Sequence, residues 1–402
     1  MAVNLPFMKD VLPVTGFRVA AARGEVRYQG RDDVALVELP PGASVAGVFT
    51  QSSFRAAPVI VAREHLAAAD VRYLLVNSGN ANAATGESGL RAARACCAGL
   101  AEIAGVETRQ VLPFSTGVIG EPLPTERVID AAAVAYAQLS GDGWEGAAKA
   151  IMTTDTAPKA VSRRVDIDGE GVVVTGMAKG VGMVRPDMAT VLAFIATDAS
   201  VDREAIGPLL SRVAIRSFNR ITVDGDTSTN DSFILMASGA KQVPRTEAGK
   251  ALLEATITEV ATLLAQWLIR DGEGASRFVT VVVSGGRDSK ECLDVAYTVA
   301  QSPLVKTALF AGDPNWGRFV MAIGRAGVED LEVRGVSIFL DDVQVVAEGG
   351  LAPTYREEDG VRVMGQDEIT VHISLGRGAA SETVWTTDLS YEYVKINAEY
   401  RT

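Results

Sequence analysis

Thr190 is the residue of this sequence whose type and setting could do the most chemistry. It stands between a stretch rich in glycine and proline, residues 180–186, and an apolar run, residues 191–197, that predicts a buried strand. A chain that cuts itself at such a junction gains a new N-terminus, and its free α-amine can act as the base for the threonine hydroxyl. The same pattern also fits an ordinary β-branched residue that opens a strand, and spacing alone does not separate the two.

Other patterns with catalytic potential are weaker. His65 and His372 are far apart in the sequence and have no partner at metal-ligand spacing, so we expect no metal site. His372 lies in an alternating strand pattern and is expected to be structural. Gly180-Val181-Gly182 is similar to part of a dinucleotide-binding loop, but Arg185 stands where a third glycine is needed.

The composition is that of a soluble globular protein. The chain has 402 residues, 48% of them hydrophobic and 22% charged, with a net charge of -12. No Lys/Arg-rich run is present, which argues against a nucleic-acid partner, and no apolar run approaches the ~18 residues of a membrane helix. Three cysteines without a CxxC pair fit a reducing compartment, and the N-terminus has no secretory pattern, so a cytoplasmic protein is expected.

Segments whose hydrophobic pattern is typical of strands alternate along the chain with segments whose pattern is typical of helices. The expected strands are residues 34–39, 45–50, 58–62, 73–76, 161–167, 171–175, 191–197, 233–237, 278–283, 336–340, 343–347 and 369–375. The expected helices are residues 90–104, 125–139, 143–151, 202–217, 246–269 and 290–301. Residues 349–365 are expected to form a long surface loop. Because regular βαβ spacing is absent, we predict a mixed α/β (α+β) fold of stacked β-sheets flanked by helices.

Polar residues gather where several of these elements end. The clusters begin near Asn77, Thr116, Thr153, Asp224 and Glu273, and they are rich in small hydroxyl, amide and acidic side chains. Each cluster alone is more typical of a structural turn. Residues 77–83 in particular are expected to form a polar loop that is either functional or tightly hydrogen-bonded.

Residues 179–190 carry a specific resemblance. This stretch, KGVGMVRPDMAT, resembles the self-cleavage motif of the ornithine acetyltransferase (ArgJ-type) family, the bifunctional glutamate N-acetyltransferases of arginine biosynthesis. Further blocks resemble the family in the same order: residues 77–83, 115–117, 152–156, 224–231, 271–275, 312–318 and 396–402. The resemblance therefore covers essentially the whole chain and favours the catalytic interpretation of Thr190.

The resemblance implies a self-cleaving, DmpA-like fold of the N-terminal-nucleophile type. Cleavage between Ala189 and Thr190 would give an alpha chain, residues 1–189, and a beta chain, residues 190–402, with Thr190 as the nucleophile. Thr116 and Gly117 match the oxyanion-hole pair. The implied substrate-binding residues are Thr153, Lys179, Thr190, Glu273, Asn397 and Thr402.

The implied reaction is a ping-pong transfer of acetyl from N-acetylornithine to glutamate, without a cofactor. Acetyl-CoA is a further donor in bifunctional members, and the implied assembly is a heterotetramer of two alpha and two beta chains. Two alternatives stay open. A threonine amidohydrolase or aminopeptidase would pass the acyl group to water, and a non-catalytic metabolite-binding protein would keep an uncut chain.

Overall fold

The chain forms two compact units. The structure is a computed structural model that describes residues 2–6, 8, 10–185 and 191–399. Of these, the smaller unit holds the chain up to Pro6, Arg220–Gly225 and the part from Ile269 onward, and the larger unit holds the rest. Ala189, Thr190 and Thr402 lie outside the described residues.

The larger unit contains two sheets. The four-stranded sheet has the order β1 (Arg18–Ala22), β2 (Val34–Glu38), β4 (Tyr73–Asn80), β5 (Val111–Val118). The five-stranded sheet has the order β3 (Ser44–Phe49), β9 (Ser232–Lys241), β8 (Leu192–Ala199), β7 (Glu170–Lys179), β6 (Lys159–Ile167). The pairs β4–β5 and β8–β9 are parallel, and the other neighbours in these two sheets are antiparallel.

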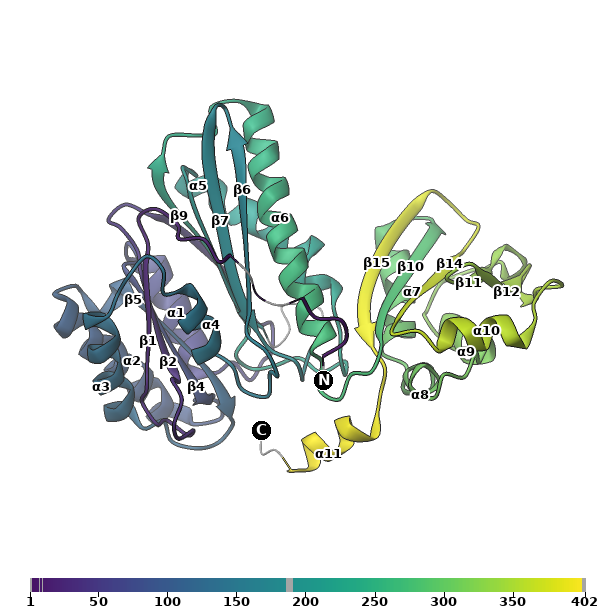
Figure 1. The fold of residues 1–402 in the computed structure, drawn as a ribbon, viewed down its shortest axis with the longest axis horizontal. Coiled ribbons are helices and arrows are strands. Elements are labelled where there is room, and N and C mark those ends of the chain that lie inside the picture. Colours follow the sequence, from purple (N-terminus) through teal and green to yellow (C-terminus); the bar gives the residue numbers. More distant parts are fainter. Residues whose placement is uncertain (1, 7, 9, 186–190, 400–402) are drawn as a thin grey trace. The chain divides into compact units, whose positions relative to one another are not determined.

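Helices pack against both sheets, mostly on their outer faces, whereas the helix at Trp144–Ala150 packs into the core between the sheets (Figure 1). The helices of the larger unit are α1 (Ala57–Ala68), α2 (Gly86–Ala104), α3 (Thr125–Ala137), α4 (Trp144–Ala150), α5 (Arg203–Arg216) and α6 (Glu247–Arg270), which ends in the smaller unit. Single 3-10 turns occur at Thr108–Gln110 and Phe218–Arg220.

Alternation along the strands explains the layers. In β4, Tyr73 and Leu75 pack in a core with α1, α2 and α3, whereas Leu74 and Val76 pack in the core shared with the five-stranded sheet. Between the sheets, the rings of Phe114 and Phe194 meet edge to face with their centroids 5.1 Å apart. The predicted fold class, a mixed α/β protein with stacked sheets and flanking helices, is confirmed.

The smaller unit has one six-stranded sheet covered by helices. Its strand order is β13 (Gly350–Leu351), β12 (Val343–Ala347), β11 (Ser337–Leu340), β14 (Glu368–Ser374), β10 (Phe278–Gly286), β15 (Ala380–Thr387). Its helices are α7 (Ser289–Ala300), α8 (Pro303–Ala311), α9 (Trp316–Gly324), α10 (Glu357–Met364) and α11 (Tyr391–Glu399), with a 3-10 turn at Val333–Gly335. Residues of α7, α8, α9 and α10 share one apolar core with this sheet.

Helix α6 is long and apolar enough to cross a membrane, and it is the one described helix that meets this test. Half of its most apolar window is buried inside the protein. Val260 and Leu264 lie against Gly176 of β7, where an added Cβ would come within 3.0 Å of both. The helix therefore packs as a core helix of the larger unit.

Most of the predicted elements are present, but three predictions were wrong. Residues 58–62 belong to helix α1, where Pro58 occupies the first turn, a position that suits proline. Strand β4 continues through Asn80, so the polar loop expected at 77–83 is half strand. The long loop expected at 349–365 contains β13 and α10, whose first turn carries Glu357, Glu358 and Asp359 at the favourable helix end.

The predicted division into residues 1–189 and 190–402 is set by a predicted cleavage of the peptide bond after Ala189. It does not follow the boundaries of the two compact units. Both compact units draw on residues from more than one stretch of sequence, and the larger unit takes residues from both sides of Ala189. The division remains a prediction.

Candidate active site

Thr116 and Gly117 lie near the end of β5, beside the parallel strand β4. Gly117 pairs with Gly79 and has a φ of +131°. A Cβ at this position would lie 2.2 Å from the carbonyl carbon of Gly79, closer than any side chain allows. Only glycine fits here, because the two backbones approach each other too closely for a side chain.

Lys179 gathers two of the predicted site threonines. It ends strand β7 and is 4% exposed. Its Nζ donates hydrogen bonds to Oγ1 of Thr116 at 3.0 Å and to Oγ1 of Thr153 at 2.8 Å. The structure thus brings Thr116, Gly117, Thr153 and Lys179 together from positions that are far apart in the sequence, and it places a cation beside the Thr116 hydroxyl.

Asp155 organises the segment that carries Thr153. Its Oδ1 accepts from Nζ of Lys159 at 2.8 Å and from the amide of Gly180 at 3.2 Å, and its Oδ2 accepts from the amide of Thr153 at 3.2 Å. Burial favours the neutral acid, but the charges of Lys159 and Lys179 outweigh it and lower the pKa of Asp155 to about 2. The ionised carboxylate therefore fixes Thr153 and the start of the loop that follows β7.

Strand β8 begins directly beside this cluster. Leu192 pairs with Lys179 of β7 on one side and with Ser232 of β9 on the other. The amide of Ser232 donates to the carbonyl of Val191 at 2.9 Å. Thr190, the predicted nucleophile, precedes Leu192 by two residues in the sequence.

The amide side chains near residue 77 form a scaffold for the same region. Ser115 donates its hydroxyl to Oδ1 of Asn77 at 2.6 Å, and Nδ2 of Asn77 donates to the carbonyl of Asn80 at 2.9 Å. From the segment before β9, Nδ2 of Asn230 donates to the carbonyls of Ala81 at 2.7 Å and Ser115 at 2.8 Å. These bonds hold the residue before Thr116 from both sides.

Two further predicted site residues meet in the smaller unit. Nδ2 of Asn397, on α11, donates to Oε2 of the buried Glu273 at 2.8 Å. Ser390 donates its hydroxyl to the carbonyl of Gly274 at 2.6 Å, which ties the segment before α11 to the loop of Glu273. Thr402, the last predicted substrate residue, lies outside the described part of the chain.

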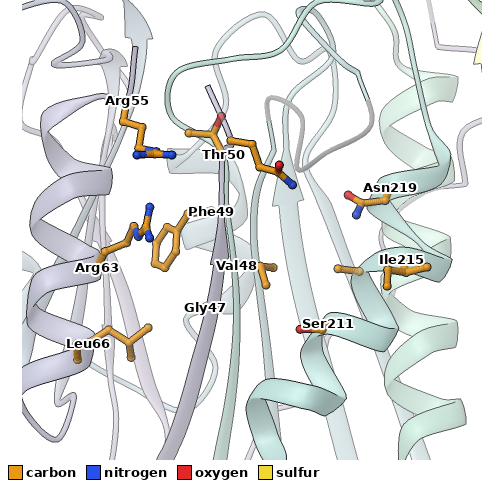
Figure 2. A pocket seen from close by; sticks show the side chains of 13 residues that line it. Gly47, Val48, Phe49, Thr50, Arg55, Arg63, Leu66, Ser211, Ile215 and Asn219 are labelled. Carbon is orange, nitrogen blue, oxygen red and sulfur yellow. The ribbon is translucent and has the colours of Figure 1, made fainter. Parts of the chain in front are cut away.

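A groove opens along the free edge of the five-stranded sheet (Figure 2). It measures about 700 Å³ and lies between α1, strand β3 and α5, with Arg55 and Arg63 directed toward it. Its lining includes Thr50, Gln51 and Asn219 but no acidic residue, although the chain has a net charge of -12. The groove is therefore suited to an anionic group.

The register relates this groove to the threonine cluster. Phe49, which lines the groove, pairs with Ser232, and Ser232 pairs with Leu192 opposite Lys179. Since neighbouring strands lie about 4.8 Å apart, Phe49 is roughly 15 Å from Lys179 across the sheet.

The sequence patterns did not single out Asp155, Lys159 or Asn230 as parts of this site. Asp155 and Asn230 do fall inside blocks that resemble the family, and this is the signal that could have singled them out. Metal ligation was not expected, and in the described ranges no group of three His, Cys, Asp or Glu side chains is placed to hold an ion. That expectation remains a prediction.

The family model of the ArgJ family matches residues 18–402. The chain belongs to the ArgJ family. The arginine biosynthesis bifunctional protein ArgJ of Pseudomonas fluorescens (strain Pf0-1) is 54% identical over 406 residues, covering 100% of both chains. The family resemblance predicted from the sequence is confirmed, and as a member of this family the chain is an acyltransferase of arginine biosynthesis.

Solved structures of ArgJ-type proteins are also similar. A crystal structure of the arginine biosynthesis bifunctional protein ArgJ from Bacillus halodurans is 34% identical, with a TM-score of 0.49, and the match covers 52% of this chain and 98% of that chain. Ornithine acetyltransferase from Mycobacterium tuberculosis, solved in complex with ornithine, is 34% identical with a TM-score of 0.42, covering 44% of this chain and 96% of that chain.

Proposed function

We propose that this ArgJ-family chain cuts itself between Ala189 and Thr190 and then transfers acetyl from N-acetylornithine to glutamate through Thr190. The observation that carries the proposal is the cluster of the buried Lys179 and Thr116 with Gly117, beside the start of β8. This cluster supplies hydrogen-bond donors and a cation at the strand that follows Thr190 in sequence.

Acetamides are poor electrophiles, so the tetrahedral intermediate needs its oxyanion stabilised. The amide of Gly117 and the hydroxyl of Thr116 are the proposed donors, worth about 3–4 kcal/mol each. Lys179 donates to Oγ1 of Thr116, and this leaves the proton of that hydroxyl available for the oxyanion. The nearby ammonium of Lys179 adds favourable charge.

The free α-amine of Thr190 is the proposed base, since its pKa of roughly 7.7–8.0 suits proton transfer at neutral pH. It takes the proton of Oγ as this oxygen attacks the acetyl carbonyl, and it returns the proton to the departing amine of ornithine. Glutamate then attacks acetyl-Thr190 and the steps run in reverse. The proposed substrate contacts are Thr153, Lys179, Glu273, Asn397 and Thr402, in which Lys179 and Glu273 bind groups of opposite charge.

Intact-protein mass spectrometry tests the first step. Self-cleavage predicts fragments of 189 and 213 residues. Thr190→Ala is expected to abolish both cleavage and acetyl transfer. An uncut wild-type protein with full transfer activity would contradict the mechanism, and so would transfer by the Thr190→Ala variant.

The fate of the acetyl group separates the transferase from its catalytic alternative. With N-acetylornithine and glutamate, the proposed enzyme forms N-acetylglutamate and ornithine in equal amounts. An amidohydrolase would release acetate instead, at a rate that does not depend on glutamate. A metabolite-binding protein would bind ligands as an uncut chain and release neither product.

Acetyl-CoA is proposed as a second donor, and the arginine-lined groove favours this. Its phosphates would lie against Arg55 and Arg63, while the acyl-bearing arm runs along the strand ends toward β8. Replacing both arginines by glutamine is expected to raise KM for acetyl-CoA while KM for N-acetylornithine stays unchanged. Equal effects on both donors would contradict this use of the groove.

We also propose a cytoplasmic heterotetramer of two alpha and two beta chains. The three cysteines are free and buried, which suits a reducing compartment. Light scattering on the cleaved protein would give the mass of two complete 402-residue copies; the mass of one copy would contradict the assembly.

A further inference from the structure

Two buried lysines lie at neighbouring strand ends of the five-stranded sheet. Lys159 begins β6 and Lys179 ends β7, and Lys159 pairs with Ala178, the residue before Lys179. The two lysines are 0% and 4% exposed. Buried charges are costly unless they are paired, so this position needs a carboxylate. Asp155 supplies one, since its fully buried side chain accepts from Nζ of Lys159 at 2.8 Å.

Three N–H donors converge on the Asp155 carboxylate. Besides Lys159, the amide of Gly180 donates to Oδ1 at 3.2 Å, and the amide of Thr153 donates to Oδ2 at 3.2 Å. Both oxygens must therefore accept, which an ionised carboxylate does and an amide side chain cannot, because an amide has only one oxygen. Burial alone would raise the pKa of Asp155, but the charges of Lys159 and Lys179 lower it to about 2, so the group stays ionised.

These contacts close a hydrogen-bonded ring. From Asp155 the ring runs through the amide of Thr153 to the Thr153 hydroxyl, which accepts from Nζ of Lys179 at 2.8 Å. It returns along the main chain of Lys179 to the amide of Gly180, which donates to Asp155. Nζ of Lys179 also donates to Oγ1 of Thr116 at 3.0 Å. The ring therefore holds Thr153 and Lys179 beside the proposed oxyanion hole.

The ring also fixes the main chain where β7 ends. Gly180 has a φ of +127°, a conformation that favours glycine, and its amide is directed at Asp155. On the other side, Nζ of Lys159 donates to the carbonyl of Ala157 at 2.9 Å, which holds the segment between Asp155 and β6. The carboxylate thus joins the segment of Thr153 to the end of β7.

We propose that Asp155 is a positioning residue for substrate binding: as the acceptor that closes this ring, it fixes Thr153 and Lys179 in one arrangement. Lys159 is its counter-ion. The inference rests on the proposed function, in which Thr153 and Lys179 contact the substrate. Asp155 acts through these two residues and takes no part in bond making, since both of its oxygens are engaged and its side chain is 0% exposed.

Two variants separate positioning from stability. Asp155→Asn keeps the shape but turns an N–H group toward one of the donors, which opens the ring. Measured per cleaved chain, kcat/KM should fall about 100-fold, as expected when binding groups are misplaced. The melting temperature should fall as well, because Lys159 is left buried without its counter-ion. Adding Lys159→Met to Asp155→Asn removes that unpaired ammonium, so the melting temperature should recover while kcat/KM stays low.

The pH profile of Lys159→Met gives a readout that a purely structural role would not change. Without Lys159, the charge of Lys179 and the amides of Thr153 and Gly180 still face Asp155, but burial is offset less and the pKa of Asp155 rises. Above the raised pKa the carboxylate closes the ring, and below it the ring opens. The plot of kcat/KM against pH should therefore gain a second, steeper acid limb that the wild type lacks.

Asp198 supplies the matched control, as a buried acid with a lysine partner in the same sheet. It is 1% exposed, Oδ1 accepts from the amide of Val173 at 2.9 Å, and Oδ2 lies 3.2 Å from Nζ of Lys241. Asp198→Asn should lower the melting temperature but leave kcat/KM and its pH profile unchanged.

A folded Asp155→Asn variant with wild-type kcat/KM would overturn the role of Asp155. Recovery of kcat/KM together with the melting temperature in the double variant would do so as well, because Asp155 would then act through stability alone. If Asp155→Asn does not fold, the double variant still decides: low kcat/KM supports the proposal, and wild-type kcat/KM overturns it. Failure of the proposed function shows separately, as a wild-type chain that stays uncut or forms no N-acetylglutamate.

Discussion

Gly117 is a proposed oxyanion-hole donor, and its backbone geometry also requires a glycine. Its φ is +131°, and an added Cβ would lie 2.2 Å from the backbone of Gly79. Gly117→Ala is expected to lower the free energy of unfolding by about 3 kcal/mol or more, from backbone strain and overpacking together. Urea unfolding measures this loss.

Gly120 is the control for Gly117. It also has a positive φ, +83°, but an added Cβ there meets nothing within 4 Å. Gly120→Ala should therefore cost only about 1–2 kcal/mol, the cost of the dihedral alone. Equal losses in the two variants would show that the close approach to Gly79 is unimportant.

Lys306 makes the stability of the smaller unit depend on pH. Burial lowers its pKa to about 8, although Asp388 and Asp224 act in the opposite direction, and its Nζ donates to Oγ1 of Thr386 at 3.2 Å and to the carbonyl of Thr387. Between pH 8 and 10.5, the ordinary pKa of a lysine, the unfolded chain binds the proton that the folded chain has released, so stability rises with pH.

The expected gain across this pH range is about 3 kcal/mol, since each pKa unit corresponds to 1.36 kcal/mol. Lys306→Met should lose stability at every pH because its hydrogen bonds vanish, but its stability should no longer rise between pH 8 and 10.5. Thermal unfolding at both pH values tests this, with the exposed Lys250→Met as the control. An unchanged pH slope in Lys306→Met would contradict the assignment.

The sequence identified single residues of the site better than it identified their partners. Thr116, Gly117, Thr153 and Lys179 were found through the family resemblance, and the structure brings them together. Asp155 and Asn230 fall inside blocks that resemble the family, but nothing in the sequence distinguishes their side chains from the others of those blocks. Their hydrogen bonds to Lys159, Ala81 and Ser115 exist only in the folded chain.

Among the elements, the segment that leads into β9 positions the end of β5 through one side chain. Asn230 bonds the carbonyls of Ala81 and Ser115, and Ser115 precedes Thr116. Asn230→Ala leaves both buried carbonyls without this partner, so we expect the free energy of unfolding to fall by about 2–4 kcal/mol and kcat to fall with it. The exposed Gln242, which bonds the carbonyl of Gly239 at 2.8 Å, gives the control.

Gln242→Ala is expected to cost less than about 0.5 kcal/mol, because water replaces the lost bond at the surface. Chemical denaturation and steady-state kinetics on both variants test the pair. A folded Asn230→Ala variant with wild-type kcat would show that the link between β9 and β5 does not support catalysis.

Elements with strong local signals were predicted well. Asp-Gly between two strand patterns is a strong sequence signal for a hairpin turn, and Asp168 and Gly169 join β6 and β7 with positive φ at both residues. The failures occurred where local patterns are ambiguous. Residues 58–62 are a short apolar run that fits a strand or a buried helix, and β15 carries polar residues at the sheet edge beside β10, which weakens its alternation.

Across the larger unit as a whole, the five-stranded sheet mixes strands from both sides of the proposed cut. Strands β3, β7 and β6 precede Ala189 in sequence, whereas β8 and β9 follow it. The order β3-β9-β8-β7-β6 places the two later strands between earlier ones, with β9 bonded to β3 and β8 bonded to β7. The two fragments therefore share one hydrogen-bonded sheet and one core.

This interleaving predicts that self-cleavage does not separate the chains. Pulling them apart would break the ladders β3–β9 and β7–β8 and expose the core around Phe194 and Ile234, which are fully buried. The fragments should elute together in size-exclusion chromatography and separate only at the denaturant concentration that unfolds the larger unit. The Thr190→Ala chain, which stays uncut, is the control and should unfold at a similar or higher concentration. Dissociation of the fragments well below the unfolding transition would contradict a sheet shared between them.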